Sequence, residues 1–365
     1  MSWNDILNHE NALERFRRSV SSGRLASTYL FVGPPGTGKR TFALKLAEAL
    51  LCETNDESQL DPCGHCSACQ QVRAASHPDL IMVGRPKDKA FIPVETFIGD
   101  REHRNQEGLC HDIGLKPFRG GRKIAIIDDA DFLNAEGANC LLKTLEEPPA
   151  GSILILIGTS EQRQLSTIVS RSQVVRFDAL KSDQVARLLG NMELPEDAPA
   201  IEQLAAASQG SVELAIELSD PSAFNFRAML FSQLATHDPG SRNFAKDVTT
   251  FVDEAGKDSA RKRKRLVRVG DFAISFFQDV LMNLSDVATV PGSGESVAEF
   301  IERLELPVDP SCVNRACELV SLCIERTMLL QHHVVANVNP ANAIAAWLTD
   351  LGRICRGVEV PALSY

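Results

Sequence analysis

Short apolar runs alternate with amphipathic segments over the first half of the chain. The runs are four or five residues long and lie at residues 29–32, 80–83, 123–127, 153–157 and 173–177. Their length suits strands rather than helices. The segments between them include helical patterns, at residues 11–22, 39–51 and 134–145. Strands that are nearly all apolar and alternate with helices predict a parallel sheet with helices on both faces.

Strand signals end after residue 177, and the pattern becomes helical. Three short helices are predicted, at residues 182–190, 198–208 and 211–218. Further helical periodicity continues to about residue 356, with a loop expected at 291–296. The chain therefore divides by pattern into an α/β domain at 1–178, a small helical domain at 179–220 and an all-helical domain at 221–365.

Composition narrows the class of protein. Of the 365 residues, 44% are apolar and 24% are charged, as in soluble proteins with several cores. No apolar stretch approaches the roughly 18 residues of a membrane helix, and the polar N-terminus lacks a signal-peptide layout. We therefore expect a cytoplasmic protein without a membrane partner. The net charge of −10 argues against a surface that wraps nucleic acid, so DNA contacts should be local or shared with partners.

A glycine-rich loop follows the first predicted strand and opens a helix. It reads Gly-Pro-Pro-Gly-Thr-Gly-Lys over residues 33–39, which is the context of a phosphate-binding loop. Gly33, Gly36 and Gly38 would let backbone N–H groups turn inward, and Lys39 would reach the outer phosphates. This loop predicts a nucleotide site.

The other residues of that site differ from those of an active ATPase. Arg40 stands where a Ser or Thr hydroxyl binds Mg²⁺, and Thr41 is rotated about 100° further round the helix. The strand at 123–127 ends in Asp128 and Asp129, in the layout of a Walker B motif. Asp128 could hold Mg²⁺ through water, but Asp129 is one methylene shorter than a water-activating glutamate. A degenerate site that binds nucleotide weakly or not at all is the alternative to an active one.

Four of the ten cysteines crowd an insert at about residues 52–69. Their spacing is typical of tetrahedral Zn²⁺ with a structural role, since four protein ligands close the metal's shell. A redox pair or reactive surface thiols are the other interpretations. His65 and His77 are weaker substitutes as ligands. The predicted ligands are Cys52, Cys63, Cys66 and Cys69.

These motifs occur together in one known family. After the loop and the cysteine insert come His-Pro-Asp at 77–79, Asn-Cys-Leu-Leu-Lys-Thr-Leu-Glu-Glu-Pro-Pro at 139–149 and Ser-Arg-Ser at 170–172. The chain resembles the AAA+ clamp-loader subunits of bacterial DNA polymerase III over residues 1–220. The stretch 337–347 is similar to the end of that family's helical collar. The resemblance implies a P-loop AAA+ core, a helical lid and a C-terminal collar that joins subunits.

The resemblance also implies roles for single residues and partners. Arg171 corresponds to the arginine finger that acts in trans on ATP bound by a neighbouring subunit. Thr159 matches the sensor position of the core domain. The implied partners are tau/gamma and delta clamp-loader subunits and, through the complex, the sliding clamp and primed DNA.

Three departures separate hydrolysing from non-hydrolysing members. Arg40 and Asp129 are two, and the lid motif at 210–213 ends in Glu213 where motor subunits have a phosphate-sensing arginine. Together they predict little or no hydrolysis and favour a subunit of the δ′ type. The alternatives are an active tau/gamma-type ATPase and, against the run at 141–149, another AAA+ ATPase such as a nucleotide switch or repair enzyme.

Overall fold

The computed structural model describes the chain except residues 1, 2, 4, 5, 87, 88, 90, 120, 237, 238, 285–293, 305–309, 359 and 361–365, and the side chains of 310–312. The chain folds into two compact units. The α/β unit comprises Met1–Met192 with Ser208–Leu214, and the helical unit comprises Glu193–Ala207 with Ala215–Tyr365. The domain boundaries predicted at 178 and 220 stay predictions.

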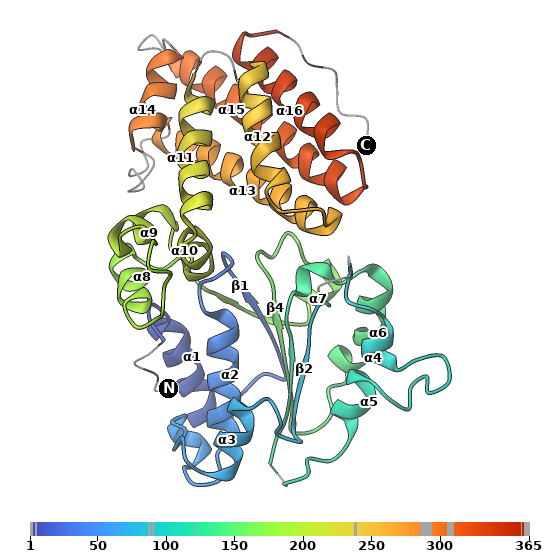
Figure 1. Ribbon diagram of the computed structural model, residues 1–365. Coiled ribbons are helices and arrows are strands. Elements are labelled where there is room, and N and C mark those ends of the chain that lie inside the picture. Colours follow the sequence, from blue (N-terminus) through green and yellow to red (C-terminus); the bar gives the residue numbers. More distant parts are fainter. Residues whose placement is uncertain are drawn as a thin grey trace. The chain divides into compact units, whose positions relative to one another are not determined.

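A five-stranded parallel sheet forms the centre of the α/β unit (Figure 1). Its order is β2-β3-β4-β1-β5, and every neighbouring pair is parallel. The predicted parallel sheet is confirmed, and each predicted strand agrees with the structure within one residue at either end. The strands are β1 (Thr28–Val32), β2 (Leu80–Val83), β3 (Lys123–Ile127), β4 (Ser152–Ile157) and β5 (Gln173–Arg176).

Alternate side chains of each central strand enter two separate cores. Tyr29 and Phe31 of β1 pack with α1 (Glu10–Ser21) and α2 (Lys39–Leu50). Leu30 and Val32 face the opposite core. That core is closed by α4 (Glu95–Ile98), α5 (Leu109–Gly114), α6 (Ala135–Glu146) and α7 (Ser166–Val169) (Figure 1). Burial on both faces is why these strands read as continuous apolar runs.

Several short helices escaped the sequence patterns. They are η2 (Glu57–Gln59), α3 (Ser67–Arg73), α4, α5, η3 (Ala130–Phe132) and α7. Helices of three to seven residues are too short to show a 3.6-residue period, so local capping decides where they begin. Asp56 caps η2 by accepting a hydrogen bond from Ser58 N, and Cys66 caps α3 through its sulfur.

The helical character predicted beyond residue 182 is confirmed. Residues 294–296, expected in a loop, instead begin α14, where Glu295 in the first turn suits the positive end of the helix dipole. Residues 291–293 lie outside the described part. The helices are α8 (Ser182–Leu189), α9 (Ile201–Ala207), α10 (Val212–Leu218), α11 (Pro221–Ala235), α12 (Arg242–Asp253), α13 (Ser259–Leu284), α14 (Gly294–Arg303), α15 (Pro310–Val335) and α16 (Pro340–Cys355).

Two helices of 26 residues, α13 and α15, pack against each other in the helical unit. Phe276 of α13 lies in the core between Phe231 and Phe300, at ring-centroid distances of 5.2 and 5.7 Å. Among the helices of the described residues, none combines the length and apolar composition that crossing a membrane requires.

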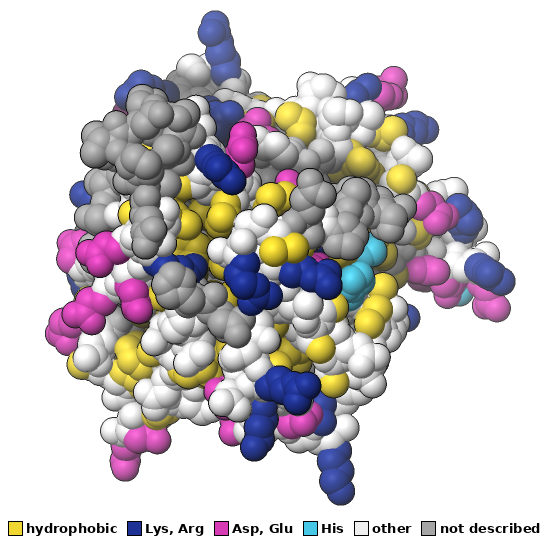
Figure 2. Space-filling view, turned by 90° about the horizontal axis from the view of Figure 1, so that it is seen from above, with side chains coloured by type: hydrophobic (Ala, Val, Ile, Leu, Met, Phe, Trp, Pro, Cys, Tyr) yellow, Lys and Arg dark blue, Asp and Glu magenta, His cyan; other side chains and the backbone are white. Residues whose placement is uncertain are grey.

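A basic run, residues 261–265 together with Arg268, lies near the start of α13, and three of its side chains contact other helices of the helical unit. Lys262 contacts Asp253 at 2.6 Å, and Arg268 contacts Glu217 at 2.5 Å. Arg265 donates to Phe251 O at 2.9 Å. On the face drawn in Figure 2, basic side chains lie among hydrophobic and uncharged ones, and most acidic side chains lie toward the edges. Lys262, Arg265 and Arg268 therefore contribute contacts between helices.

Candidate nucleotide site and cysteine cluster

The glycine-rich loop leaves the carboxyl end of β1, where the sheet's connections change direction. β1 lies between β4 and β5, so the loop emerges at the edge where open α/β sheets bind their ligands. Gly33 N donates to Thr159 O at 3.1 Å, which places the start of the loop beside the residues that follow β4. The topology thus puts the predicted loop and the predicted sensor together.

Two glycines are required by close approaches. A Cβ on Gly33 would lie 2.1 Å from Phe177 O. Gly36 has a φ of +70°, and a Cβ there would lie 2.2 Å from Ser211 Oγ. Such contacts leave room for hydrogen alone, so both positions need glycine.

Lys39 is turned back onto its own loop. Its Nζ donates to Gly33 O at 2.7 Å and to Pro34 O at 2.5 Å. Burial lowers the pKa of Lys39 to about 8, against the opposing pull of Asp131 and other acids nearby. The ammonium that would meet phosphate is therefore satisfied by backbone carbonyls in this structure.

His9 makes a hydrogen bond to the phosphate loop, a contact that the sequence analysis missed. Its Nε2 lies 2.6 Å from Thr37 O, and since a carbonyl only accepts, that nitrogen carries the proton. The ring packs edge-on against Phe177 and Phe42, at centroid distances of 4.7 and 6.3 Å. Burial lowers the pKa of His9 below 6.5. A lone histidine before a helix has no pattern that could have revealed this role.

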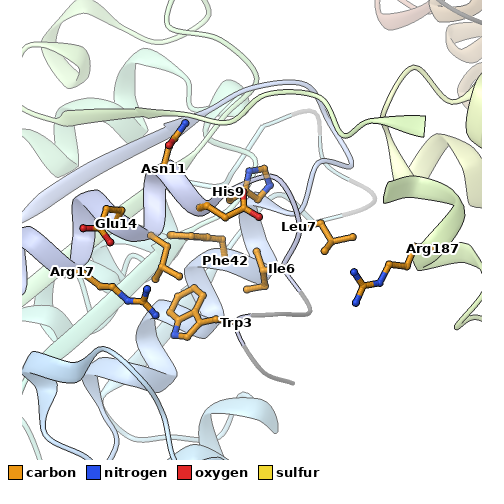
Figure 3. A pocket seen from close by; sticks show the side chains of 11 residues that line it. Trp3, Ile6, Leu7, His9, Asn11, Glu14, Arg17, Phe42 and Arg187 are labelled. Carbon is orange, nitrogen blue, oxygen red and sulfur yellow. The ribbon is translucent and has the colours of Figure 1, made fainter. Parts of the chain in front are cut away.

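A pocket of about 790 Å³ has His9 among the residues that line it (Figure 3). Trp3 and Phe42 lie together at 5.3 Å between ring centroids, and Arg187 of α8 contributes from a separate element. Glu14 and Arg17 of α1 add charge to its lining. None of the predicted site residues is among the described residues that line it.

The acidic end of β3 faces the start of α2. Arg40 Nη1 lies 3.4 Å from Asp128 Oδ2, and Thr41 is half-buried one residue further along α2. Burial and the neighbouring Asp128 raise the pKa of Asp129. A metal of the kind implied by this loop would need the hydroxyl that Arg40 replaces and the carboxylate that Arg40 holds. These side chains do not fit Mg²⁺.

Thr159 is bound to a carboxylate that the sequence analysis did not single out. Its Oγ1 donates to Asp131 Oδ2 at 2.6 Å, and its backbone N donates to the same group at 3.0 Å. Gln164 Nε2 also donates to Asp131. A third acid shortly after Asp128 and Asp129 was the available signal. The hydroxyl of the predicted sensor, Thr159, is thereby bound to a carboxylate of the chain itself.

The predicted lid motif at 210–213 lies against the phosphate loop. Val212 N donates to Gly36 O at 3.0 Å, and Leu180 N donates to Gly210 O at 3.1 Å. The Glu213 Cβ lies 2.8 Å from the place a Cβ on Gly36 would occupy. Glu213 therefore lies close to the phosphate loop.

The four clustered cysteines converge on one point. Their sulfur atoms all lie within 4.8 Å of one another. The Cys52–Cys66 and Cys63–Cys69 Sγ distances are 4.0 and 3.9 Å, far beyond a disulfide bond. Four sulfurs at ~2.3 Å from a tetrahedral zinc ion would lie about 3.8 Å apart. The cluster has the geometry to bind zinc.

Backbone N–H groups point at these sulfurs. Cys66 N donates to Cys63 Sγ at 3.3 Å, and Cys69 N donates to Cys66 Sγ at 3.4 Å. Burial opposes ionisation of Cys63, but hydrogen bonds from the His65 and Cys66 backbones lower its pKa to about 5. Such donors favour the thiolates that zinc needs.

The two histidines considered as substitute ligands face elsewhere. His65 Nδ1 lies 2.9 Å from Cys63 O, so this ring nitrogen contacts a carbonyl oxygen. His77 Nδ1 accepts a hydrogen bond from Asp79 N at 3.0 Å. The donor set is therefore the four sulfurs.

Arg171 follows α7 and pairs with the end of α6. Its Nη2 lies 2.7 Å from Glu146 Oε1, and its Nη1 donates to Thr167 O at 3.2 Å. The side chain is 34% exposed. Two motifs far apart in the sequence, at 139–149 and 170–172, therefore meet through this contact.

The part of the chain that holds these residues is similar to known proteins. The family described as "DNA polymerase III, delta subunit" matches residues 8–181. Over that stretch, the chain is similar to clamp-loader subunits of DNA polymerase III. The match includes the phosphate loop, the cysteine cluster, the end of β3 and Arg171.

Relatives of two kinds resemble this chain. The delta' subunits of Bacillus subtilis and Pseudomonas aeruginosa are 31% and 35% identical over 60% and 51% of the chain. The tau subunit of Escherichia coli is 32% identical over 59% of it. The aligned part spans 62%, 53% and 32% of those three relatives, respectively.

The chain thus brings most of its predicted site residues together in one place. The loop glycines, Lys39 and Thr159 lie at the carboxyl edge of the sheet, with Glu213 against the loop. The cysteines form a second cluster, and Arg171 a third position beside Glu146. His9 and Asp131 are the residues that sequence reasoning missed.

Proposed function

We propose that this chain is the δ′-type subunit of a DNA polymerase III clamp loader, a stator that hydrolyses no ATP of its own. It supplies Arg171 to ATP on a neighbouring motor subunit. The observation that carries the proposal is the 3.4 Å ion pair between Arg40 and Asp128. A guanidinium held at the metal position deprives the chain's own site of Mg²⁺ chemistry.

Two further features weaken the chain's own site. Glu213 stands against the phosphate loop, where a negative charge repels phosphate. Asp129 has a raised pKa and a side chain too short to place a water well. Binding and hydrolysis are therefore both disfavoured by residues within the same site.

Arg171 supplies the activity that remains. An arginine finger stabilises the negative charge that develops on a transferred phosphoryl group. Glu146 holds the guanidinium at 2.7 Å, while a third of the side chain stays exposed. When a neighbour's phosphate approaches, its oxygens would replace the carboxylate by charge-assisted hydrogen bonds of the same kind.

The remaining parts have structural roles in this proposal. The four cysteines would bind a structural zinc ion that orders the insert at 52–69. Residues 221–365 would form the collar that joins tau/gamma and delta subunits into a ring, with residues 179–220 as the lid. The sliding clamp and primed DNA would be reached through that complex.

The test is Arg171→Ala in a clamp loader reconstituted with tau/gamma and delta subunits. Removal of an arginine finger lowers turnover at the served site on the order of 10³-fold, so ATP hydrolysis by the complex and clamp loading should both fall. Assembly, followed by gel filtration, should be unchanged because the side chain is partly exposed.

Arg176→Ala is the matched control, since Arg176 also pairs with a glutamate, Glu161, at 2.6 Å and is 72% exposed. Hydrolysis and loading should match the wild type in this variant. Equal rates for Arg171→Ala and the wild type would refute the finger. Clear turnover by the purified chain alone, with Mg²⁺ and primed DNA, would favour the tau/gamma-type alternative.

A further inference from the structure

The Asp128 carboxylate has both of its oxygens engaged within the chain. Oδ2 lies 3.4 Å from Arg40 Nη1, and Oδ1 accepts a hydrogen bond from Asp129 N at 3.1 Å. Arg40 lies in the first turn of α2, whereas Asp128 directly follows β3, so the pair joins two separate parts of the fold. A cation already stands where a divalent ion would be held.

The other polar groups around this pair are satisfied in the same manner. Lys39 donates to the loop carbonyls of Gly33 and Pro34, and Thr159 donates to Asp131. A divalent ion would have to displace the guanidinium from Asp128 or approach it closely. Because both are positive, close approach is repulsive, and the pair disfavours the ion.

Stability is a poor explanation for the pair. The Arg40 side chain is 61% exposed and that of Asp128 is 26% exposed. Ion pairs with so much solvent contact contribute little to folding. The pair instead has a chemical consequence, because Arg40 neutralises the negative charge of Asp128 at this site.

We propose that Arg40 is an intramolecular replacement for the divalent cation and the residue that excludes Mg²⁺ from this site. Its guanidinium neutralises Asp128 and occupies the metal position. This deepens the proposed function, on which it rests, by naming the cause of the missing hydrolysis. Arg40 thus decides which cation neutralises Asp128, its own guanidinium or a dissolved Mg²⁺ ion.

The experiment follows a divalent cation directly, in the zinc-loaded full chain. Mn²⁺ serves as the paramagnetic probe for Mg²⁺, and its binding is measured by electron paramagnetic resonance with and without ATP. In the wild type, ATP with protein should bind Mn²⁺ no more tightly than ATP alone. Arg40→Ser and Arg40→Ala should each strengthen Mn²⁺ binding about tenfold or more, the scale on which a metal site responds to one supporting group.

Two controls separate charge from position. Arg40→Lys keeps a cation beside Asp128 and should resemble the wild type. Arg18→Ser removes an arginine of the same unit that is 76% exposed and pairs with Glu14, and it should change nothing. Circular dichroism checks that each variant is folded.

Two results would overturn the proposal. One is ATP-dependent Mn²⁺ binding by the wild type as tight as that of Arg40→Ser. The other is failure of both Arg40→Ser and Arg40→Ala to gain Mn²⁺ affinity. Neither result touches the Arg171→Ala assay, so failure of this inference is distinguishable from failure of the stator proposal.

Discussion

Single buried side chains set the shape of the phosphate loop. His9 donates to Thr37 O, and Lys39 donates to Gly33 O and Pro34 O. Thr37 Oγ1 donates to Pro34 O at 3.0 Å. Since each of these side chains has a hydrogen-bond partner in the loop, together they hold its backbone. Of these groups, His9 is the one whose charge changes on the acid side of neutral pH.

His9 predicts acid sensitivity of the α/β unit. Burial lowers its pKa, so below pH 6.5 the unfolded chain takes up a proton that folded His9 does not. The stability due to neutral His9 is present above pH 6.5 and is lost as the pH falls. Denaturant unfolding of the wild type between pH 5 and 7.5 should therefore show a slope that His9→Gln reduces, by at most about 1.4 kcal/mol per pH unit.

Glutamine at position 9 keeps a hydrogen-bond donor but removes the titrating group. Its amide can still donate to Thr37 O, but it does not titrate in this range. His103→Gln, at an exposed position of the same unit, should retain the wild-type slope. If His9→Gln kept the full slope as well, acid sensitivity would have another origin.

At the scale of elements, the cysteine insert combines a candidate metal site with short secondary structure. Cys66 caps α3, a helix of seven residues, by accepting from Cys69 N. Helices this short are unstable alone. Arg122 of the sheet region pairs with Glu57, and Arg73 of α3 pairs with Glu48 of α2 at 2.7 Å. These ties attach the insert to the core.

Cys66→Ser should separate capping from metal binding. Serine is a good N-cap, so the start of α3 keeps its hydrogen bond, but one of four thiolates is lost. We expect zinc content, measured by elemental analysis, to fall well below one ion per chain. The thermal midpoint of the α/β unit should also fall by several degrees, since bound metal stabilises the folded state.

Cys140→Ser is the control for that variant. Cys140 is a half-buried free cysteine on α6, outside the cluster. It should leave zinc content at the wild-type value. Full zinc content in Cys66→Ser would show that the cluster does not hold the ion through all four sulfurs.

At the scale of the whole molecule, the chain contains separate cores in two units. The α/β unit is built on its sheet, and the helical unit on residues such as Phe272, Phe276 and Phe300, which are essentially fully buried. Each unit buries its own apolar residues, so each has its own source of stability. Unfolding should therefore occur in more than one step.

Calorimetry can test this with two perturbations. Phe276→Ala should destabilise the helical unit by about 3–5 kcal/mol and lower one transition. Zinc chelation should lower the other, because the cysteine cluster lies in the α/β unit. A single transition that moves in both experiments would contradict independent units.

Much of the fold follows from local sequence. The central strands β1, β3 and β4 are short apolar runs, and because both of their faces are buried, the sequence predicts them without knowledge of their neighbours. The phosphate loop and the cysteine cluster are also local, since glycine placement and thiol spacing act within a few residues. Short helices such as α3 and α7 were missed because they carry no full period.

Contacts between distant residues could not be derived this way. The pairing of Arg40 with Asp128, of Thr159 with Asp131 and of His9 with Thr37 depends on how strands are ordered in the sheet. The sequence by itself determined the alternating α/β architecture, the phosphate loop and the departures at Arg40, Asp129 and Glu213. Only the tertiary structure decided that Arg40 is bound to Asp128, because side-chain partners across a sheet are chosen by packing and not by spacing along the chain.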